Sequence, residues 1–392
     1  MTSLPAPPQP EPAALAHSAR LTEQIRAEIA ANGGMISFFR FMELALYAPG
    51  LGYYSAGSRK LGAEGDFITA PEGSALFSRC LARQCQQILT QSGGDILELG
   101  AGSGIMAVDL LLELETLGDL PTHYFILELS AELRARQRET LIQRAPHLLD
   151  RVRWLNHLPG SGFSGVILGN EVLDAMPVQR FRITEEGPRP LGVSWDMDRF
   201  SWCVGAEQQQ ISEAVKAIQQ YLNDTLPLAY ESEFNPQLAA WLASLADVLS
   251  SGVLLLIDYG YPRRVYYHSQ RTTGTLLCHY RHRAHDNPLI LPGLQDITVS
   301  VDFTAVAEAA VTAGFKVAGY TSQHYFLFGC GLAELLAEVD PDDQRRYLEL
   351  SRQAKWLTLP GEMGERFKAI ALTRNWDRPL RSFTVFDERG RL

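Results

Sequence analysis

The sequence of 392 residues predicts an α/β protein with one mostly parallel, seven-stranded sheet and helices on both faces. Short, almost continuous apolar runs alternate with segments of helical periodicity, the pattern of parallel strands joined by right-handed helical crossovers. A glycine-rich turn follows the first apolar run and opens a helix, as in Rossmann-like folds. The predicted strands are 95–99, 124–129, 152–155, 164–170, 252–259, 315–320 and 367–373.

Helices are predicted before, between and after these strands. The glycines at 33 and 34 end a helix over 21–31, because glycine readily adopts the left-handed conformation that terminates helices. Ser37 is suited to cap a second helix over 38–47, since its hydroxyl can accept a hydrogen bond from a free backbone amide. Further helices are predicted over 73–91, 105–117, 131–144 and 303–313.

These elements divide the chain into successive parts. Its beginning is rich in proline and alanine, so a disordered tail is expected there. The sheet domain carries insertions after strands four and six, and such insertions commonly build the substrate side of α/β enzymes. The predicted parts are a tail (1–18), an N-terminal helical extension (19–92), the sheet domain (93–376) with insertions at about 180–240 and 331–360, and a C-terminal tail (377–392).

The composition limits the classes of function. Apolar residues make up 46% and charged residues 20% of the chain, an ordinary balance for a globular protein. The formal charge of −10 argues against nucleic-acid binding, because an acidic surface repels phosphate. No apolar run approaches the roughly 18 residues that span a bilayer, so no stable membrane insertion is expected. The basic stretch from Arg281 to His285 is either a solvated loop or a contact for an acidic partner.

The cysteines and the N-terminus bear on the cellular compartment. The five cysteines include no Cys-x-x-Cys pair, so neither a disulfide framework nor a metal site is expected. Free thiols suit a reducing compartment. The N-terminal segment has neither the basic and apolar regions of a secretory signal nor the arginines of a transit peptide. We therefore expect a cytoplasmic protein.

The glycine-rich turn after the first strand predicts the cofactor. A dinucleotide fingerprint reads Gly-x-Gly-x-x-Gly, but here the spacing is Gly-x-Gly-x-Gly and the next residue is Ile105. This form, with an acid two residues before the first glycine, is associated with S-adenosylmethionine. That cofactor has no phosphates, and its amino-acid end matches a backbone amide and a carboxylate. The predicted cofactor contacts in this turn are Glu98, Gly100, Ala101, Gly102 and Gly104.

The second strand supplies a candidate partner for the cofactor ribose. Glu128 lies at its carboxyl end, close to the roughly 20-residue spacing expected of a ribose acid. A carboxylate has only acceptor sites and can accept hydrogen bonds from both ribose hydroxyls. We expect Glu128 and its neighbour Leu129 to contact the cofactor. The alternative interpretation involves no cofactor. In that case the glycine turn only serves packing within the α/β fold, and Glu128 is an ordinary surface glutamate.

The fourth strand predicts the catalytic residues. Its end faces the methyl group in methyltransferase sheets, so Asn170 is predicted to contact the cofactor, and Glu171 and Asp174 are predicted to be catalytic. The two acids are three residues apart on an expected turn into a helix, which places both carboxylates on one side. They would hold a cationic acceptor such as arginine and stabilise the resulting charge. The alternative is that Asn170 and Asp174 only cap that helix.

Together these segments resemble the MidA family, which includes a mitochondrial arginine methyltransferase needed for assembly of respiratory complex I. The matching blocks span most of the chain from about Ile36 to Phe328. They are GDFITAPE (65–72), ELGAGSG (98–104), NEVLDAMPV (170–178), DYG (258–260), QDIT (295–298) and VDF (301–303).

The resemblance implies a class I methyltransferase fold and S-adenosylmethionine as the cofactor. It also implies that the loop 65–72, with Asp66 and Thr69, closes over the cofactor, and it suggests arginine methylation on a protein, such as a complex I subunit. This sequence reads Leu-Gly-Ala-Glu over 61–64, where the family more usually has a basic residue, which weakens the case for an anion contact there.

The predicted function is methylation of a protein nitrogen, on arginine. A non-catalytic assembly factor that retains the cofactor site and a small-molecule methyltransferase remain alternatives. Retained Glu171 and Asp174 favour catalysis, because a pure binding protein does not need acids beside the methyl group. Ile105 argues against a nicotinamide oxidoreductase. The sequence also leaves open whether the protein forms a homodimer, either by pairing of sheet edges or by contacts between helices.

Overall fold

The computed structural model describes residues 8–56, 68–340 and 342–392. The described chain divides into two compact units, each assembled from three separate stretches of sequence. Unit 1 comprises Met1–Phe67, Leu173–Gln237 and Tyr261–Asp302, and unit 2 comprises Ile68–Val172, Leu238–Gly260 and Phe303–Leu392.

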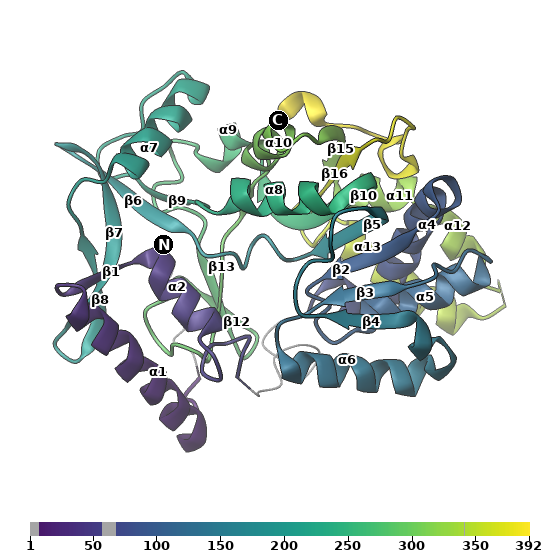
Figure 1. Cartoon of the computed structure of the whole chain (residues 1–392), viewed down its shortest axis with the longest axis horizontal. Coiled ribbons are helices and arrows are strands. Elements are labelled where there is room, and N and C mark those ends of the chain that lie inside the picture. Colours follow the sequence, from purple (N-terminus) through teal and green to yellow (C-terminus); the bar gives the residue numbers. More distant parts are fainter. Residues whose placement is uncertain (1–7, 57–67, 341) are drawn as a thin grey trace. The chain divides into compact units, whose positions relative to one another are not determined.

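Unit 2 contains the predicted sheet (Figure 1). Its strands are β2 (Asp95–Leu99), β3 (Tyr124–Leu127), β4 (Val152–Leu155), β5 (Phe163–Asn170), β10 (Leu249–Tyr261), β15 (Lys316–Ser322) and β16 (Phe367–Arg374). The order across the sheet is β15-β16-β10-β5-β2-β3-β4. The run from β4 to β10 pairs in parallel, whereas β16 is antiparallel to both β10 and β15. The predicted strands and the mostly parallel sheet are confirmed.

The position of β2 determines where a ligand can bind. After β2 the chain adds β3 and β4 on one side, then returns to add β5 on the other side. In doubly wound sheets the ligand crevice opens at this reversal, outside the carboxyl ends of the strands. The glycine turn follows β2 and Asn170 ends β5, so both lie at the reversal.

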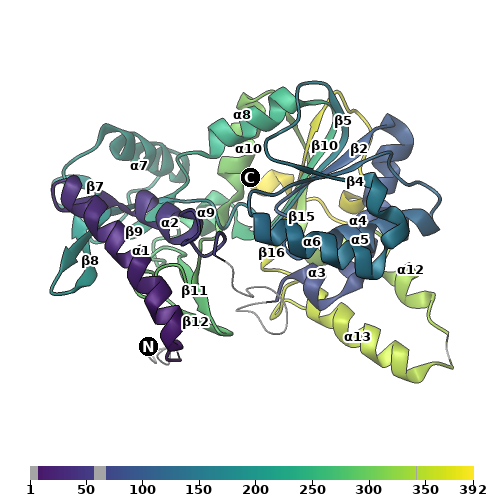
Figure 2. The same ribbon diagram turned by 60° about the horizontal axis from the view of Figure 1, so that its bottom comes forward.

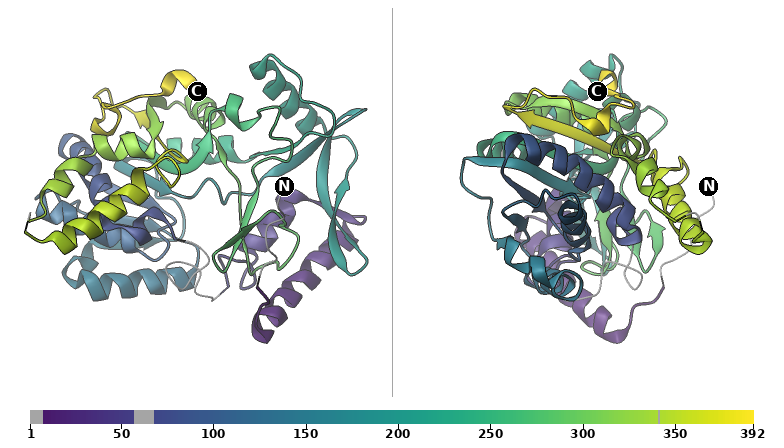
Figure 3. Two further views of the ribbon diagram at one scale, coloured as in Figure 1. Left: turned by 180° about the vertical axis from the view of Figure 1, so that it is seen from behind. Right: turned by 90° about the vertical axis from the view of Figure 1, so that its right-hand side faces the viewer.

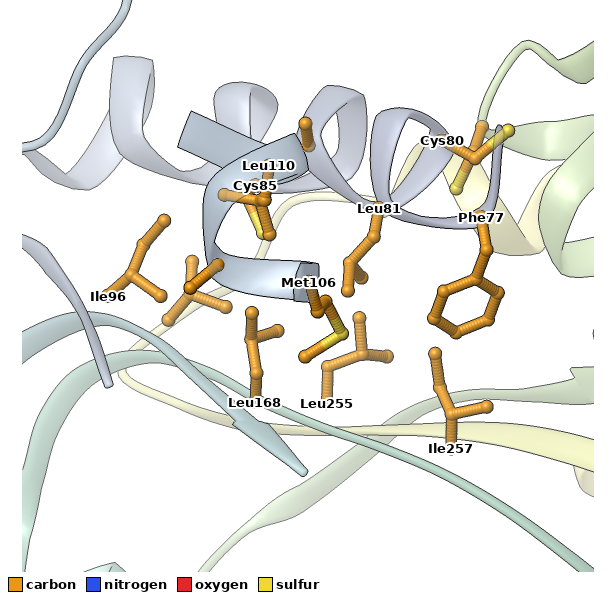
Figure 4. Close-up of a cluster of buried hydrophobic side chains, with 14 of the residues drawn as sticks. Phe77, Cys80, Leu81, Cys85, Ile96, Met106, Leu110, Leu168, Leu255 and Ile257 are labelled. Atoms are coloured by element: carbon orange, nitrogen blue, oxygen red, sulfur yellow. The ribbon is translucent and has the colours of Figure 1, made fainter. Parts of the chain in front are cut away.

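Helices cover both faces of this sheet. The helices of unit 2 are α3 (Ala70–Gly73), α4 (Ala75–Ser92), α5 (Ile105–Thr116), α6 (Ala131–Arg144), α8 (Leu238–Val248), α10 (Phe303–Thr312), α11 (Gln323–Gly329), α12 (Leu332–Ala337) and α13 (Gln344–Thr358). Figure 4 shows Phe77 of α4 and Met106 of α5 packed against Leu168, Leu255 and Ile257. Helices α8 and α10 lie side by side (Figure 2) and cover the opposite face.

The double cover explains the apolar runs in the sequence. Every residue from Val253 to Ile257 is at most 2% exposed. A strand with one solvent-exposed face would alternate polar and apolar residues. A strand buried on both faces instead needs apolar residues throughout. At about 25 cal/mol per Å² of buried apolar surface, these central strands contribute much of the stability of unit 2.

Unit 1 is a smaller mixed unit. Its helices are α1 (Pro12–Ala31), α2 (Phe38–Tyr47), α7 (Gln209–Leu222) and α9 (Arg263–Tyr266), and its strands are β1 (Met35–Ser37), β6 (Gln179–Thr184), β7 (Gly187–Asp196), β8 (Arg199–Val204), β9 (Glu231–Phe234), β11 (Leu277–Tyr280), β12 (Arg283–His285), β13 (Asp296–Thr298) and β14 (Val301–Asp302). An antiparallel sheet β1-β7-β6-β9, with β8 beside β7, packs against α1 and α2 on one face and α7 on the other (Figure 3). The expected cap is present, since Ser37 accepts a hydrogen bond from the Arg40 amide at 3.1 Å.

The described residues near each end of the sequence, from 8 and from 377, include more regular structure than the sequence suggested. Helix α1 begins at Pro12, within the segment predicted to be a disordered tail. The His17 ring and the Ser18 hydroxyl bond to the carbonyls of Leu51 and Pro292, and such distant contacts leave no local pattern. The predicted C-terminal tail contains two short 3₁₀ turns, Arg381–Phe383 and Arg389–Arg391, and Phe383 lies directly over Gly319.

Three further observations concern the part of the chain that the structure describes. None of its helices combines the length and apolar character that would be needed to cross a bilayer. The five cysteines are free thiols. No group of His, Cys, Asp and Glu side chains among these residues is arranged to hold a metal ion.

Candidate cofactor site

The glycine turn makes a tight bend at the end of β2. Gly100, Gly102 and Gly104 have φ values of +67°, +53° and +82°. Residues with a Cβ rarely adopt this region, so the conformation itself requires the three glycines. The Gly100 amide donates to the Leu127 carbonyl at 3.1 Å, which ties the turn to the end of β3. Gly100 is exposed, and a Cβ there would meet only Val172, at 3.7 Å. The space beside Gly100 is therefore open to a ligand.

Glu128 follows β3 and is held by two donors. Its Oε1 accepts from the Ser130 amide at 2.9 Å, and its Oε2 accepts from the Gln137 side chain at 3.0 Å. Burial raises the pKa of Glu128, and these hydrogen bonds oppose that shift. A carboxylate has about four lone-pair sites, so each oxygen keeps acceptor capacity for a further hydroxyl. The next side chain, Leu129, is 80% exposed and offers an apolar surface beside the carboxylate.

Glu98 lies in the core rather than at the surface. Its side chain is 1% exposed and accepts a hydrogen bond from the Tyr124 hydroxyl at 2.7 Å. Burial raises the pKa of Glu98 to about 7, against the opposing effect of that hydrogen bond. The acid that precedes the glycine turn therefore joins β2 to β3 from the inside.

Asn170 ends β5 on the other side of the reversal. Its Nδ2 donates to Glu171 Oε1 at 3.2 Å. Its Oδ1 is buried and has no hydrogen-bond partner among the described residues. Leaving a buried acceptor unpaired costs about 1–3 kcal/mol, so this oxygen is suited to a donor from a ligand.

Comparison with known proteins shows the family of this chain. The model of a family of S-adenosyl-L-methionine-dependent methyltransferases, Methyltransf_28, matches residues 80–321. The chain belongs to this family. A crystal structure of a COG1565 superfamily protein from Burkholderia thailandensis, bound to S-adenosyl-homocysteine, is 44% identical with a TM-score of 0.94 and covers 99% of this chain and 100% of that chain.

Named relatives extend the comparison. Protein arginine methyltransferase NDUFAF7 of Homo sapiens is 28% identical and covers 86% of this chain and 80% of its own length. The NDUFAF7 homolog of Drosophila melanogaster is also 28% identical and covers 93% of this chain and 87% of its own length. The predicted family resemblance, methyltransferase fold, enzyme class and cofactor are confirmed.

The methyltransferase departs from the prediction after β5. The expected helix over Glu171 to Asp174 is absent from this described segment, and the chain passes through turns to β6. Glu171 has a φ of +52°, which is incompatible with a right-handed helix, and Pro177 restricts the residue before it. The argument that helical spacing aligns the two acids is therefore wrong, and so is the alternative that Asn170 and Asp174 cap a helix.

The two predicted catalytic acids also belong to different units. Glu171 is in unit 2, where its amide donates to the Ile257 carbonyl at 2.9 Å and continues the β5–β10 pairing. Asp174 is in unit 1, where its carbonyl accepts from the Val299 amide at 3.0 Å and its side chain is buried. Each acid is held by its own surroundings rather than by a shared helix.

The segment before α4 contributes to the glycine turn. Asp66 and its two neighbours in the predicted covering loop, Gly65 and Phe67, lie outside the described residues. Thr69 is partly exposed, and its carbonyl accepts from the Gly73 amide at 3.0 Å. One residue that the sequence did not single out is Glu72 of α3, whose carboxylate accepts a hydrogen bond from the Ser103 hydroxyl within the turn. Its position at the end of the GDFITAPE block was the one feature of the sequence that could have indicated a role at this site.

Proposed function

We propose that this methyltransferase transfers a methyl group from S-adenosylmethionine to a nitrogen of an arginine side chain in a protein substrate. Named relatives that align with 86–93% of the chain are protein arginine methyltransferases. The observation that carries the proposal is the set of acceptors at the strand ends of unit 2, where Glu128 keeps open lone pairs and Asn170 keeps a buried oxygen.

The residues present fit this cofactor. A carboxylate with spare acceptor sites suits the two ribose hydroxyls, so Glu128 would bind the ribose. The exposed side chain of Leu129 would cover the adenine, since flat apolar rings pack well on aliphatic groups. The open backbone at Gly100 and the Asn170 oxygen would receive the amino-acid end. Glu98 would act by fixing the end of β2.

Catalysis would depend on alignment and charge. S-adenosylmethionine, when bound, supplies a methyl group on a positively charged sulfur. The acceptor nitrogen must present a lone pair to that carbon and lose a proton as it gains the methyl group. A carboxylate such as that of Glu171 can orient a guanidinium and accept this proton. Asp174 is proposed as a second acid that attracts the cationic acceptor.

Binding of S-adenosyl-homocysteine tests the cofactor half of the proposal. Calorimetric titration should show binding to the wild type and at least about 100-fold weaker binding to Glu128→Ala, because two hydrogen bonds to a charged acceptor, each worth about 1.5–3 kcal/mol, are lost. Glu139→Ala is the matched control, because this acid is exposed on α6, the helix that follows Glu128. Equal affinity of the two variants would remove Glu128 from the site.

Labelled methyl transfer tests the acceptor half. Incubation with methyl-labelled cofactor and a protein extract should place the label in methylarginine after hydrolysis. Glu171→Gln should lose transfer while it keeps affinity for S-adenosyl-homocysteine. Label in small molecules would support a small-molecule methyltransferase instead. Cofactor binding without any transfer would support the assembly-factor alternative.

A further inference from the structure

We propose that Gln137 of α6 is a positioning residue that orients the Glu128 carboxylate toward the cofactor ribose and couples it to the glycine turn. This inference rests on the ribose-binding role proposed for Glu128. The sequence analysis did not single out Gln137, because one glutamine in a polar helix is usually a solvated side chain.

The side chain of Gln137 is fully buried and uses both ends of its carboxamide. Its Nε2 donates to the Gly102 carbonyl at 3.1 Å and to Glu128 Oε2 at 3.0 Å. Its Oε1 accepts from the Trp154 indole nitrogen at 2.9 Å. An indole nitrogen only donates, so Trp154 fixes the oxygen end and turns both N–H groups toward the carbonyl and the carboxylate.

These contacts join two successive β–α connections to the neighbouring strand β4. Gly102 lies in the turn after β2, Glu128 follows β3, and Trp154 is in β4. Each strand end is therefore tied to the same side chain at the edge where the ligand crevice opens. A displacement of Gln137 would change the Glu128 carboxylate and the backbone of the turn together.

Helix α6 is attached to the sheet mainly through polar groups. Its buried residues are Gln137 and Leu141. Arg134, one turn before Gln137, donates to the Glu128 carbonyl at 2.6 Å and to the Leu155 carbonyl at 2.7 Å. Thr140, one turn after it, donates to the Ser103 carbonyl at 2.8 Å. One helix face therefore holds Glu128 by its carbonyl and its carboxylate, together with the glycine turn.

A packing role alone would not require this chemistry. An apolar side chain of similar length could fill the volume, but it would leave the Glu128 carboxylate without this donor. The hydrogen bond from Gln137 lowers the pKa of Glu128, against the larger raising effect of burial. Holding the carboxylate charged and oriented before the ligand arrives reduces the cost of binding.

The test combines affinity, pH dependence and a double-mutant cycle. Gln137→Met keeps the length and removes all three hydrogen bonds, and Gln143→Met on the exposed side of α6 is its matched control. Gln137→Met should weaken binding of S-adenosyl-homocysteine about tenfold, and the control should bind like the wild type. In a Glu128→Ala background, Gln137→Met should cause a much smaller loss, because most of its effect passes through Glu128.

The pH profiles separate positioning from structural damage. For Gln137→Met, the loss of affinity at low pH should move to higher pH, because Glu128 then protonates more easily. For Gln137→Glu, affinity should instead recover as the pH falls, since the new carboxyl group regains a donor when protonated. Gln137→Glu keeps the volume and the acceptor for Trp154, so it serves if the methionine variant does not fold.

The outcomes distinguish this inference from the proposed function. If Glu128→Ala alone leaves the affinity unchanged, the ribose role of Glu128 fails, and the inference falls with it. If Glu128→Ala weakens binding but Gln137→Met causes the same loss in both backgrounds, with unshifted pH profiles, Gln137 acts by packing. That second result would overturn the inference and leave the proposed function intact.

Discussion

Substitution of Gly104 by alanine tests whether the glycine turn is shaped by the close approach of α6. Gly104 has a φ of +82°, and a Cβ there would lie 3.0 Å from the Cα of Gln137 and 3.2 Å from its Cβ. The nearest atom is backbone, so the helix itself must move by a few tenths of an ångström. Gly118 provides a matched control, because its φ is +77° and a Cβ there meets nothing within 4 Å.

The expected magnitude separates into two terms. Both substitutions place a side chain in the left-handed region, at a cost of about 1 kcal/mol. Gly104→Ala also overpacks the contact with α6, which typically costs a further 1–3 kcal/mol. We therefore expect Gly118→Ala to lower the free energy of unfolding by about 1 kcal/mol and Gly104→Ala to lower it by about 2–4 kcal/mol.

Urea unfolding followed by circular dichroism measures this difference. Affinity for S-adenosyl-homocysteine should fall only for Gly104→Ala, because the displaced helix carries the side chain that holds Glu128. Equal destabilisation by the two substitutions would refute the reasoning. The left-handed backbone alone would then explain the glycine at position 104.

Two other predictions concern pH and a turn. Burial raises the pKa of Glu98 from a usual 4.5 to about 7, so the folded protein retains a proton that the unfolded chain releases, and this contribution to stability is lost as the pH rises through that range. Relative to wild type, Glu98→Gln should therefore gain about 3 kcal/mol in free energy of unfolding between pH 5 and pH 8, measured with urea at each pH; a constant difference would contradict this. Arg281 and His282, which connect β11 to β12, have φ values of +48° and +59°. Because asparagine followed by glycine suits a turn with two positive φ values, the double substitution Arg281→Asn with His282→Gly should stabilise the protein by about 1–2 kcal/mol in thermal unfolding. A lower melting temperature would count against that account of the turn.

The sequence could predict the sheet and the glycine turn because local residues determine both. A strand buried on both faces needs a continuous apolar run, such as 253–257. Such runs indicate the positions of the strands in the sequence. Positive φ values at Gly100, Gly102 and Gly104 require glycine. The Gly-x-Gly-x-Gly spacing in the sequence therefore predicts the bend. Glu128 could be proposed as the ribose partner because its position at the end of a predicted strand is visible in the sequence.

The residues that were missed depend on distant contacts. Gln137 is buried only because the ends of β2, β3 and β4 surround it. Helix α1 extends to Pro12 with support from a contact between Ser18 and Pro292. The helix expected after β5 is wrong for a different, local reason, because Pro177 disfavours a helical conformation of the residue before it.

The position of β16 between β15 and β10 has a consequence for synthesis of the chain. Strand β16 pairs along β10, yet it comes after every other described strand in sequence order. About a hundred residues separate the two strands, so at roughly 5–20 residues per second β10 waits about 5–20 s on the ribosome without its neighbour. An uncovered apolar strand edge invites pairing with other chains. The nascent protein would therefore depend most on chaperones in the interval before its C-terminal region emerges, and chains that stop short of Phe367 should aggregate.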